Sequence, residues 1–154
     1  MAAARSKQSL KERSPMNDTT QQNSDSFDLI GFDHLTLVVA NVENSRKFYV
    51  DQLGFTEVQR PAFSFPGAWF EIGQSMIHVT ESDDLSGKAG WGDRAVTRTS
   101  RGHHFAYRTS NFEQALRAID SHEIEIASGP QTRPDGANQV YIYDPDRHLV
   151  EICS

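Results

Sequence analysis

The 154-residue chain has little cysteine, no excess of positive charge and no long apolar run. Its one cysteine, Cys153, excludes a disulfide within the chain and suits a reducing compartment, so we expect a cytoplasmic protein. Acidic residues outnumber basic ones by 21 to 15, which argues against a nucleic-acid partner. No stretch is apolar enough for a signal peptide or a bilayer span, so we expect no membrane attachment.

The N-terminal segment, residues 1–26, differs in composition from the rest. It is rich in Ser, Gln, Asn, Lys and Glu and has no apolar run that could be buried. We therefore predict a disordered tail at 1–26 and one folded domain at 27–154, a length sufficient for a sizeable core.

The first part of the domain, about residues 30–82, carries the signals of a βαβββ unit. A β-branched, apolar strand begins at His34, and Asn41 is a plausible N-cap for a helix from about Val42 to Gln52. Gly54 stands where a glycine would end that helix. Three further strands are predicted at 56–59, 68–72 and 76–81.

The same order recurs in the second part, about residues 100–154. A shift of 70 residues places His34 on His104 and Asn41 on Asn111. After Asn111 we predict a helix to about Ser121, then strands at 123–127, 139–143 and 148–153. The sequence thus predicts an α+β fold of two tandem βαβββ modules.

Four possible metal ligands occupy matching places in the repeat. His34 and His104 begin the first strand of their modules, and His78 and Glu151 lie in the last strands, 44 and 47 residues later. Glu151 stands in mid-strand between Val150 and Ile152, where a carboxylate suits a ligand better than a core. If the modules pack about a pseudo-twofold axis, the four side chains converge and suit divalent Zn, Ni, Co, Mn or Fe.

A simpler interpretation stands beside this one for every histidine. His34 and His104 could be ordinary strand residues, and His78 a hydrogen-bonded core residue. Of the other histidines, His103 is expected on the opposite sheet face or the surface, His122 at a helix end, and His148 in an exposed position beside the Asp144-Pro-Asp turn.

The combined motifs resemble the vicinal oxygen chelate superfamily, which includes glyoxalase I, bleomycin-resistance proteins, fosfomycin-modifying thiol transferases and extradiol dioxygenases. The resemblance rests on Asp33-His-Leu-Thr-Leu-Val-Val, Phe48-Tyr49, Leu53-Gly54-Phe55, Gly102-His-His-Phe-Ala-Tyr, Gly129-Pro130 and Asp144-Pro-Asp-Arg-His-Leu-Val-Glu151. It covers Phe32 to Cys153 and implies one divalent metal ion per site.

The resemblance implies that His34, His104 and Glu151 bind the metal. Glyoxalase I has a fourth ligand, a glutamate, at the position of His78, so the chain departs from that pattern; His78 could still bind the ion or act as a base. We take Glu151 and His78 as the catalytic candidates. Family members often build the site across a homodimer, with the histidine pair from one chain and His104 with Glu151 from the other.

Three functions follow as hypotheses. The first is a glyoxalase-type, metal-dependent lyase or isomerase that acts on a small oxygenated substrate. The others are an Fe(II) dioxygenase or thiol transferase with the same three ligands, and a metal-free binding protein of the bleomycin-resistance kind. Candidates for an apolar cleft wall are Phe63, Phe65, Trp69 and Trp91, and candidates for binding a substrate carboxylate are Arg60, Arg98, Arg101 and Arg133. The simpler interpretation is that the tryptophans are core or loop residues and the arginines are solvated. The segment from Ser82 to Arg101 is a linker or a lid.

Overall fold

The structure, a computed structural model, describes residues 31–91 and 102–154, and within it Phe32–Ser154 is one compact unit. The predicted tail at 1–26 and the candidates Arg98 and Arg101 lie outside the described residues.

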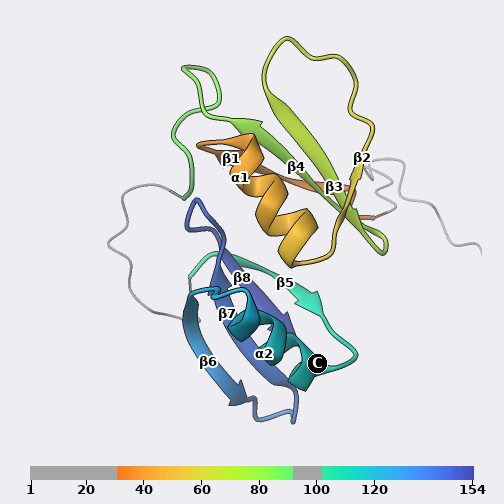
Figure 1. Cartoon of the computed structure of the whole chain (residues 1–154), viewed down its shortest axis with the longest axis vertical. Helices are drawn as coiled ribbons and strands as arrows, with labels where there is room; N and C mark the ends of the chain where they lie inside the picture. The colour runs from red at the N-terminus through yellow and green to blue at the C-terminus, as the bar shows by residue number, and fades with distance from the viewer. Residues whose placement is uncertain (1–30, 92–101) are drawn as a thin grey trace, which may run out of the picture. The chain divides into compact units, whose positions relative to one another are not determined.

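The first module follows the predicted order of elements (Figure 1). Its sheet has the strand order β1-β4-β3-β2, with β1 parallel to β4 and the other pairs antiparallel. The elements are β1 His34–Val39, α1 Val42–Arg46, a π-helical continuation η1 Lys47–Gln52, β2 Thr56–Val58, β3 Gly67–Ile72 and β4 Ser75–Glu81.

The second module repeats this arrangement in the order β5-β8-β7-β6, with β5 parallel to β8. Its elements are β5 His104–Arg108, α2 Phe112–Ser121, β6 Ile126–Thr132, β7 Asn138–Tyr143 and β8 Leu149–Cys153. The predicted fold of two βαβββ modules is therefore confirmed.

One strand begins later than predicted. We expected a strand from residue 123, whereas β6 starts at Ile126. Glu123 adopts a left-handed φ of 54°, and the backbone N–H of Ile124 donates to Ile119 O, so these residues close the C-terminus of α2. These hydrogen bonds at the end of α2 keep Glu123 and Ile124 out of the strand that their sequence favours.

Each helix begins at the predicted asparagine. The Asn41 side chain accepts from the backbone N–H of Asn44, and Asn111 accepts from that of Gln114, both at 3.0 Å. These bonds satisfy donors that the first helical turn leaves without partners.

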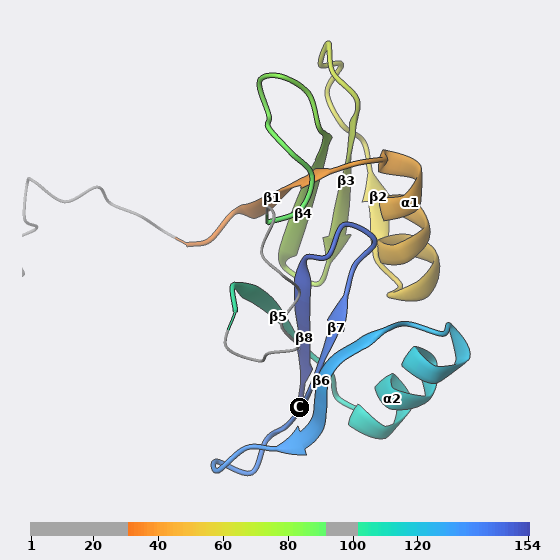
Figure 2. The ribbon, with the colours of Figure 1, turned by 90° about the vertical axis from the view of Figure 1, so that its left-hand side faces the viewer.

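Each helix covers one face of its own sheet (Figure 2). Alternate strand residues point toward the helices and form a core that both modules share, with Leu37, Phe70, Ile77 and Val150 among its buried members. The opposite faces of the two sheets carry the predicted ligands.

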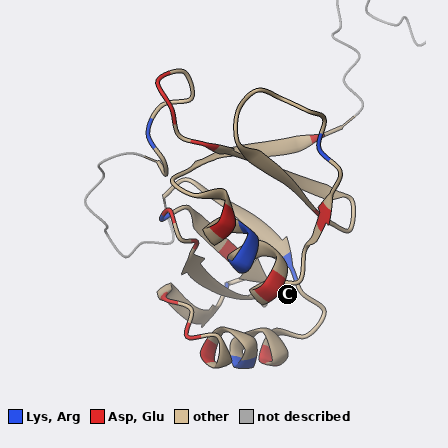
Figure 3. Cartoon of the chain, turned by 45° about the horizontal axis from the view of Figure 1, so that its top comes forward, with Lys and Arg blue, Asp and Glu red and all other residues tan. Residues whose placement is uncertain are grey.

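Charge is mixed along the helices. Acidic and basic positions are interspersed on α1 and α2 (Figure 3), with Glu43 and Arg46 on one and Glu113 and Arg117 on the other. In the described ranges, none of the helices is both long and apolar enough to cross a membrane.

Candidate metal centre

Glu151 lies on β8, on the face that the core does not use. Its register partners are Tyr141 on β7 and Ala106 on β5, and the residue is only 6% exposed. Its neighbours Leu149 and Tyr141 are also buried. Among buried side-chain atoms of the described residues, Oε1 of Glu151 has no hydrogen-bond partner of good geometry. The Tyr141 hydroxyl nevertheless lies close to the carboxylate, since burial, followed by Glu151, raises the pKa of that tyrosine. A buried carboxylate oxygen without a well-placed donor is costly, so this atom is suited to contact a cation.

His104 faces the same carboxylate. Its Nδ1 lies 2.8 Å from Gly102 O. Because a carbonyl oxygen can only accept, Nδ1 carries the proton and donates the hydrogen bond. In the neutral ring Nε2 is then an acceptor, and it lies 3.2 Å from Oε2 of Glu151. Two acceptors at this distance need a proton or a metal ion to hold them together.

The separation of these two atoms fits shared coordination. Two ligand atoms, each about 2.1 Å from one ion at octahedral or tetrahedral angles, lie about 3.0–3.4 Å apart. The Nε2–Oε2 distance of 3.2 Å falls inside that interval. The residues present therefore fit a divalent ion, and the hydrogen bond to Gly102 fixes the tautomer that a ligand needs.

His34, at the start of β1, is also held through a hydrogen bond of its Nδ1. Its Nδ1 lies 2.6 Å from Oδ1 of Asp33, so Nδ1–H donates to the carboxylate and Nε2 is left as the potential ligand atom. The side chain is 37% exposed and that of Asp33 is 93% exposed. This histidine is thus oriented but open to solvent.

His78 lies in a stack of three rings on the same sheet face. Its ring centroid is 3.8 Å from that of His34 and 4.1 Å from that of Trp69. Its Nε2 lies 3.0 Å from the sulfur of Met76. Burial, followed by the nearby His34, lowers the pKa of His78 below its usual value, which favours the neutral ring.

The stack limits what His78 can do beside His34. Lone pairs of an imidazole lie in the plane of the ring, and the two planes are only 21° apart at 3.8 Å. One ion cannot lie in both planes at bonding distance. In this arrangement His78 is a stacking partner, and its role as a fourth ligand stays a prediction that requires the ring to turn.

The four predicted ligands form two pairs rather than one group. His34 contacts His78, and His104 contacts Glu151. In the part of the chain that the structure describes, no three His, Cys, Asp or Glu side chains are placed to hold one ion. Convergence of all four, and binding of metal by any of them, remain predictions.

A buried network that the sequence analysis missed joins the two modules. Asp144 Oδ2 accepts from Tyr49 OH at 2.8 Å and from His148 Nδ1 at 2.7 Å, while Oδ1 accepts from the backbone N–H of His148 at 2.7 Å and of Asp146 at 3.0 Å. The expectation that His148 is exposed was wrong, because the residue is only 1% exposed. The Asp-x-x-x-His spacing, beside a turn that needs side-chain acceptors, was the available signal. Burial and the Asp144 carboxylate also raise the pKa of Tyr49.

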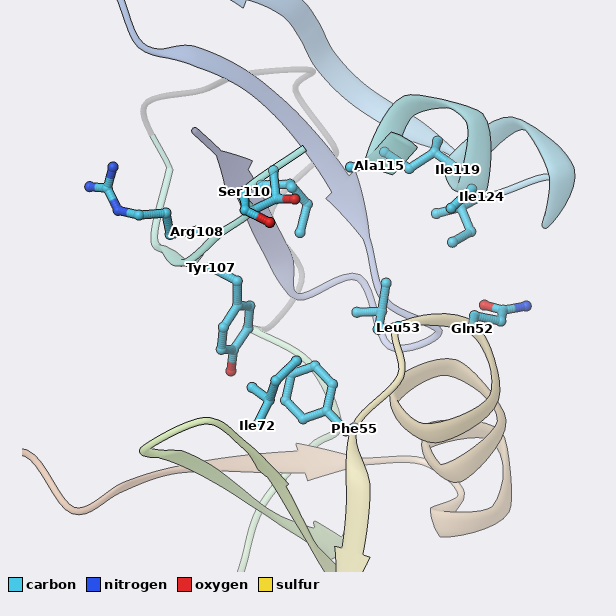
Figure 4. A pocket seen from close by; sticks show the side chains of 13 residues that line it. Gln52, Leu53, Phe55, Ile72, Tyr107, Arg108, Ser110, Ala115, Ile119 and Ile124 are labelled. Atoms are coloured by element: carbon cyan, nitrogen blue, oxygen red, sulfur yellow. The ribbon is translucent and has the colours of Figure 1, made fainter. Parts of the chain in front are cut away.

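A cavity of about 330 Å³ lies between the modules on the side of the helices (Figure 4). Leu53 and Phe55 line it from the first module, and Tyr107, Ile119 and Ile152 line it from the second. Tyr107 and Ile152 alternate along their strands with His104 and Glu151 and therefore lie on the other sheet face. Because this cavity is separate from the predicted ligands, we do not assign it to the metal centre.

Comparison with known proteins identifies the family of the chain. Residues 31–152 match the model of the Glyoxalase/Bleomycin resistance protein/Dioxygenase superfamily. Glyoxylase I 4 of Arabidopsis thaliana is 22% identical over 131 residues, which is 82% of this chain and 71% of that protein.

Solved structures share the fold. A glyoxalase family protein from Enterococcus faecalis has a TM-score of 0.60 at 20% identity, over 80% of this chain and 97% of that one. The fosfomycin resistance protein FosX from Mesorhizobium loti has a TM-score of 0.58 at 17% identity, and the match covers 82% of this chain and 92% of FosX. Since the family model spans most of the chain and the two-module fold is present, the chain belongs to the Glyoxalase/Bleomycin resistance protein/Dioxygenase superfamily.

Proposed function

We propose that the protein is a metal-dependent enzyme, a lyase or isomerase of glyoxalase type, whose small substrate chelates a divalent ion through two neighbouring oxygens. The observation that carries the proposal is the pair of His104 Nε2 and Glu151 Oε2. These two acceptors lie 3.2 Å apart, and the other oxygen of Glu151 is buried with no hydrogen-bond donor in good geometry, with the Tyr141 hydroxyl as its nearby neutral group. A single divalent ion would satisfy both groups.

The proposed ligands are His34, His104 and Glu151. Gly102 O and the Asp33 carboxylate hold the imidazoles in the tautomer that directs Nε2 outward. When bound, the ion supplies Lewis acidity that stabilises negative charge developing on the substrate oxygens. His78 is the proposed base, because it lies beside His34 and its ring is the remaining proton acceptor of that pair.

We further propose that each site is shared by two copies of the chain in a homodimer. The histidine pair of the first module and the His104–Glu151 pair of the second are separate within one chain. A second copy would bring one pair of each kind together and complete a set of three or four ligands.

A second candidate function is an Fe(II) dioxygenase or a thiol transferase. The stacking of His78 between His34 and Trp69 favours it, because only two histidines and one carboxylate then remain to bind metal. That set leaves coordination positions open for substrate and oxygen.

The deciding experiment is elemental analysis of the protein after gel filtration, with the Glu151→Gln variant beside it. We expect about one equivalent of divalent metal per chain and its loss in the variant, since an amide is a far weaker ligand than a carboxylate. Glu125→Gln is the matched control, because that glutamate is half exposed and pairs with Arg147.

The metal that is found selects the activity assay. Zn, Ni, Co or Mn directs the assay to hemithioacetals and related thiol adducts, and iron directs it to oxygen uptake with catechols. Equal metal content in the wild type and in Glu151→Gln would refute the proposed centre. No retained metal after reloading with each ion would support a ligand-binding protein instead.

A further inference from the structure

Two phenylalanines stand exposed in the loop between β2 and β3. Phe63 is 47% and Phe65 37% exposed, and their ring centroids are 5.2 Å apart. The guanidinium carbon of Arg60 lies 4.6 Å from the centroid of one ring and 4.7 Å from that of the other. We call these three residues the loop cluster. Its cation–π contacts order the loop but leave both rings partly in contact with water.

The loop cluster continues into the predicted metal face. The Phe63 centroid is 6.3 Å from that of Trp69, which in turn stacks on His78, the neighbour of His34. Trp69 and His78 are register partners on β3 and β4 and therefore lie on the same face of the sheet. A continuous row of π-systems thus runs from the loop to the first proposed ligand.

Within the described residues Arg60 forms no ion pair, a property it shares with Arg108 and Arg117 but not with Arg46, Arg133 or Arg147. Its Nη2 donates to Phe65 O at 3.1 Å. The partly buried guanidinium therefore keeps donors and a positive charge available for an anion.

The position of the Arg60 side chain depends on Gly67. A Cβ at position 67 would lie 2.5 Å from Val79 O and 3.2 Å from Nε and Nη2 of Arg60. The absence of a side chain at Gly67 lets the guanidinium lie against the start of β3. Arg60 is thus held at the edge of the aromatic row by its ring contacts, its bond to Phe65 O and this close approach.

We propose that the ligand of this face is a small, planar aromatic acid, whose ring packs against Phe63 and Trp69 and whose anionic group binds Arg60. The inference rests on the proposed function, because it takes the face that bears His34 as the substrate side of the metal centre. An aromatic ring matches the row of π-systems, and an anion supplies the counter-charge that Arg60 lacks.

The test is calorimetric titration with three probes of similar size: 2-naphthoate, 2-naphthalenemethanol and decahydronaphthalene-2-carboxylate. The first carries both ring and charge, and each of the others lacks one of them. We expect 2-naphthoate to bind about tenfold more tightly than either. Each titration is done with protein stripped by chelator and with protein reloaded with Zn²⁺, so that ring and anion binding are separated from metal binding.

Variants then assign the binding to the loop cluster. Arg60→Gln should remove the preference for 2-naphthoate over the alcohol, and Phe63→Leu should weaken both aromatic probes about three- to tenfold. Arg117→Gln and Leu85→Ala, two exposed positions outside the cluster, should leave all three affinities unchanged.

The two proposals fail in different ways. No preference for 2-naphthoate in either state of the protein, or a preference that survives Arg60→Gln, overturns the aromatic-acid proposal, whatever the metal content. A preference that depends on Arg60 in protein that never retains metal supports the aromatic-acid site and overturns the metal-dependent function.

Discussion

The two modules share one framework but surround their paired ligand candidates differently. In the second module Glu151 is 6% exposed and is the register partner of the buried Tyr141. Its counterpart in the first module, His78, is only partly buried and stacks on His34 and Trp69, whereas the first-strand histidines His34 and His104 are similarly exposed, at 37% and 30%. Equivalent strand positions therefore carry a buried carboxylate in one module and a partly buried, ring-stacked imidazole in the other. The repeat determines where side chains project, and local packing determines what chemistry they can perform.

The turns before the last strands of the modules differ in the same sense. In the first module Gly73 has a φ of 59°, and the turn is exposed. In the second module Asp144 is 3% exposed and binds Tyr49 of the other module, while Asp146 Oδ1 accepts from the backbone N–H of Ala40 at 2.8 Å. The turn that precedes Glu151 is thus hydrogen-bonded to the other module, whereas among the described residues no hydrogen bond joins the turn that precedes His78 to the second module.

Breaking the hydrogen bonds of the Asp144 turn should give the largest change in stability. Asp144→Ala removes four accepted hydrogen bonds and leaves Tyr49 OH and the His148 ring buried without their partner. We expect a loss of about 3–5 kcal/mol in the free energy of unfolding, measured by urea denaturation. Gln74→Ala, in the exposed turn of the first module, should cost less than about 0.5 kcal/mol. Similar losses in the two variants would contradict the difference between the turns.

Replacing one candidate ligand in each module should show how much each module contributes to metal affinity. Glu151→Gln should lower the affinity for Zn²⁺ at least about a hundredfold, whereas His78→Ala should change it less than about tenfold, because His78 is held in the ring stack. Competition with a chelator of known affinity measures both. A larger loss of Zn²⁺ affinity in His78→Ala than in Glu151→Gln would show that the histidine pair of the first module contributes more to metal binding than Glu151 does.

Much of this framework follows from the sequence because it depends on local rules. Asn41 and Asn111 mark both helix starts, and strand alternation puts Glu151 on the face opposite Val150, as the structure confirms. Such features need only nearest-neighbour geometry, which the residue types themselves encode.

The remaining features depend on contacts between distant segments. Burial of His148 requires Tyr49, about a hundred residues earlier, to approach the Asp144 turn. Stacking of His78 on Trp69 requires the register of β3 against β4. No periodicity reports these pairings, so composition favoured an exposed His148 and left the role of His78 open.

The proposed sharing of sites between two chains can be tested by mixing inactive halves. His34→Ala and Glu151→Gln each damage the candidate ligands of a different module, so a mixed dimer would contain one intact site and one doubly damaged site. After co-refolding equal amounts, about a quarter of the wild-type metal content should return, since about half of the dimers are mixed. Metal analysis of each variant refolded alone gives the baseline. No gain in the mixture would indicate that each site is completed within one chain.

The smallest expected effects compare the two helix caps. Asn111→Ala should lower the free energy of unfolding by about 1 kcal/mol, because the side chain satisfies the backbone N–H of Gln114. Asn41→Ala should cost less, about 0.5 kcal/mol, because Glu81 Oε2 also accepts from the first turn of α1, at the backbone N–H of Val42. Urea denaturation of both variants, with the exposed Gln114→Ala as control, measures the difference. A greater loss in Asn41→Ala would mean that Glu81 does not share the capping of α1, and it would make the first module the more dependent of the two on its cap.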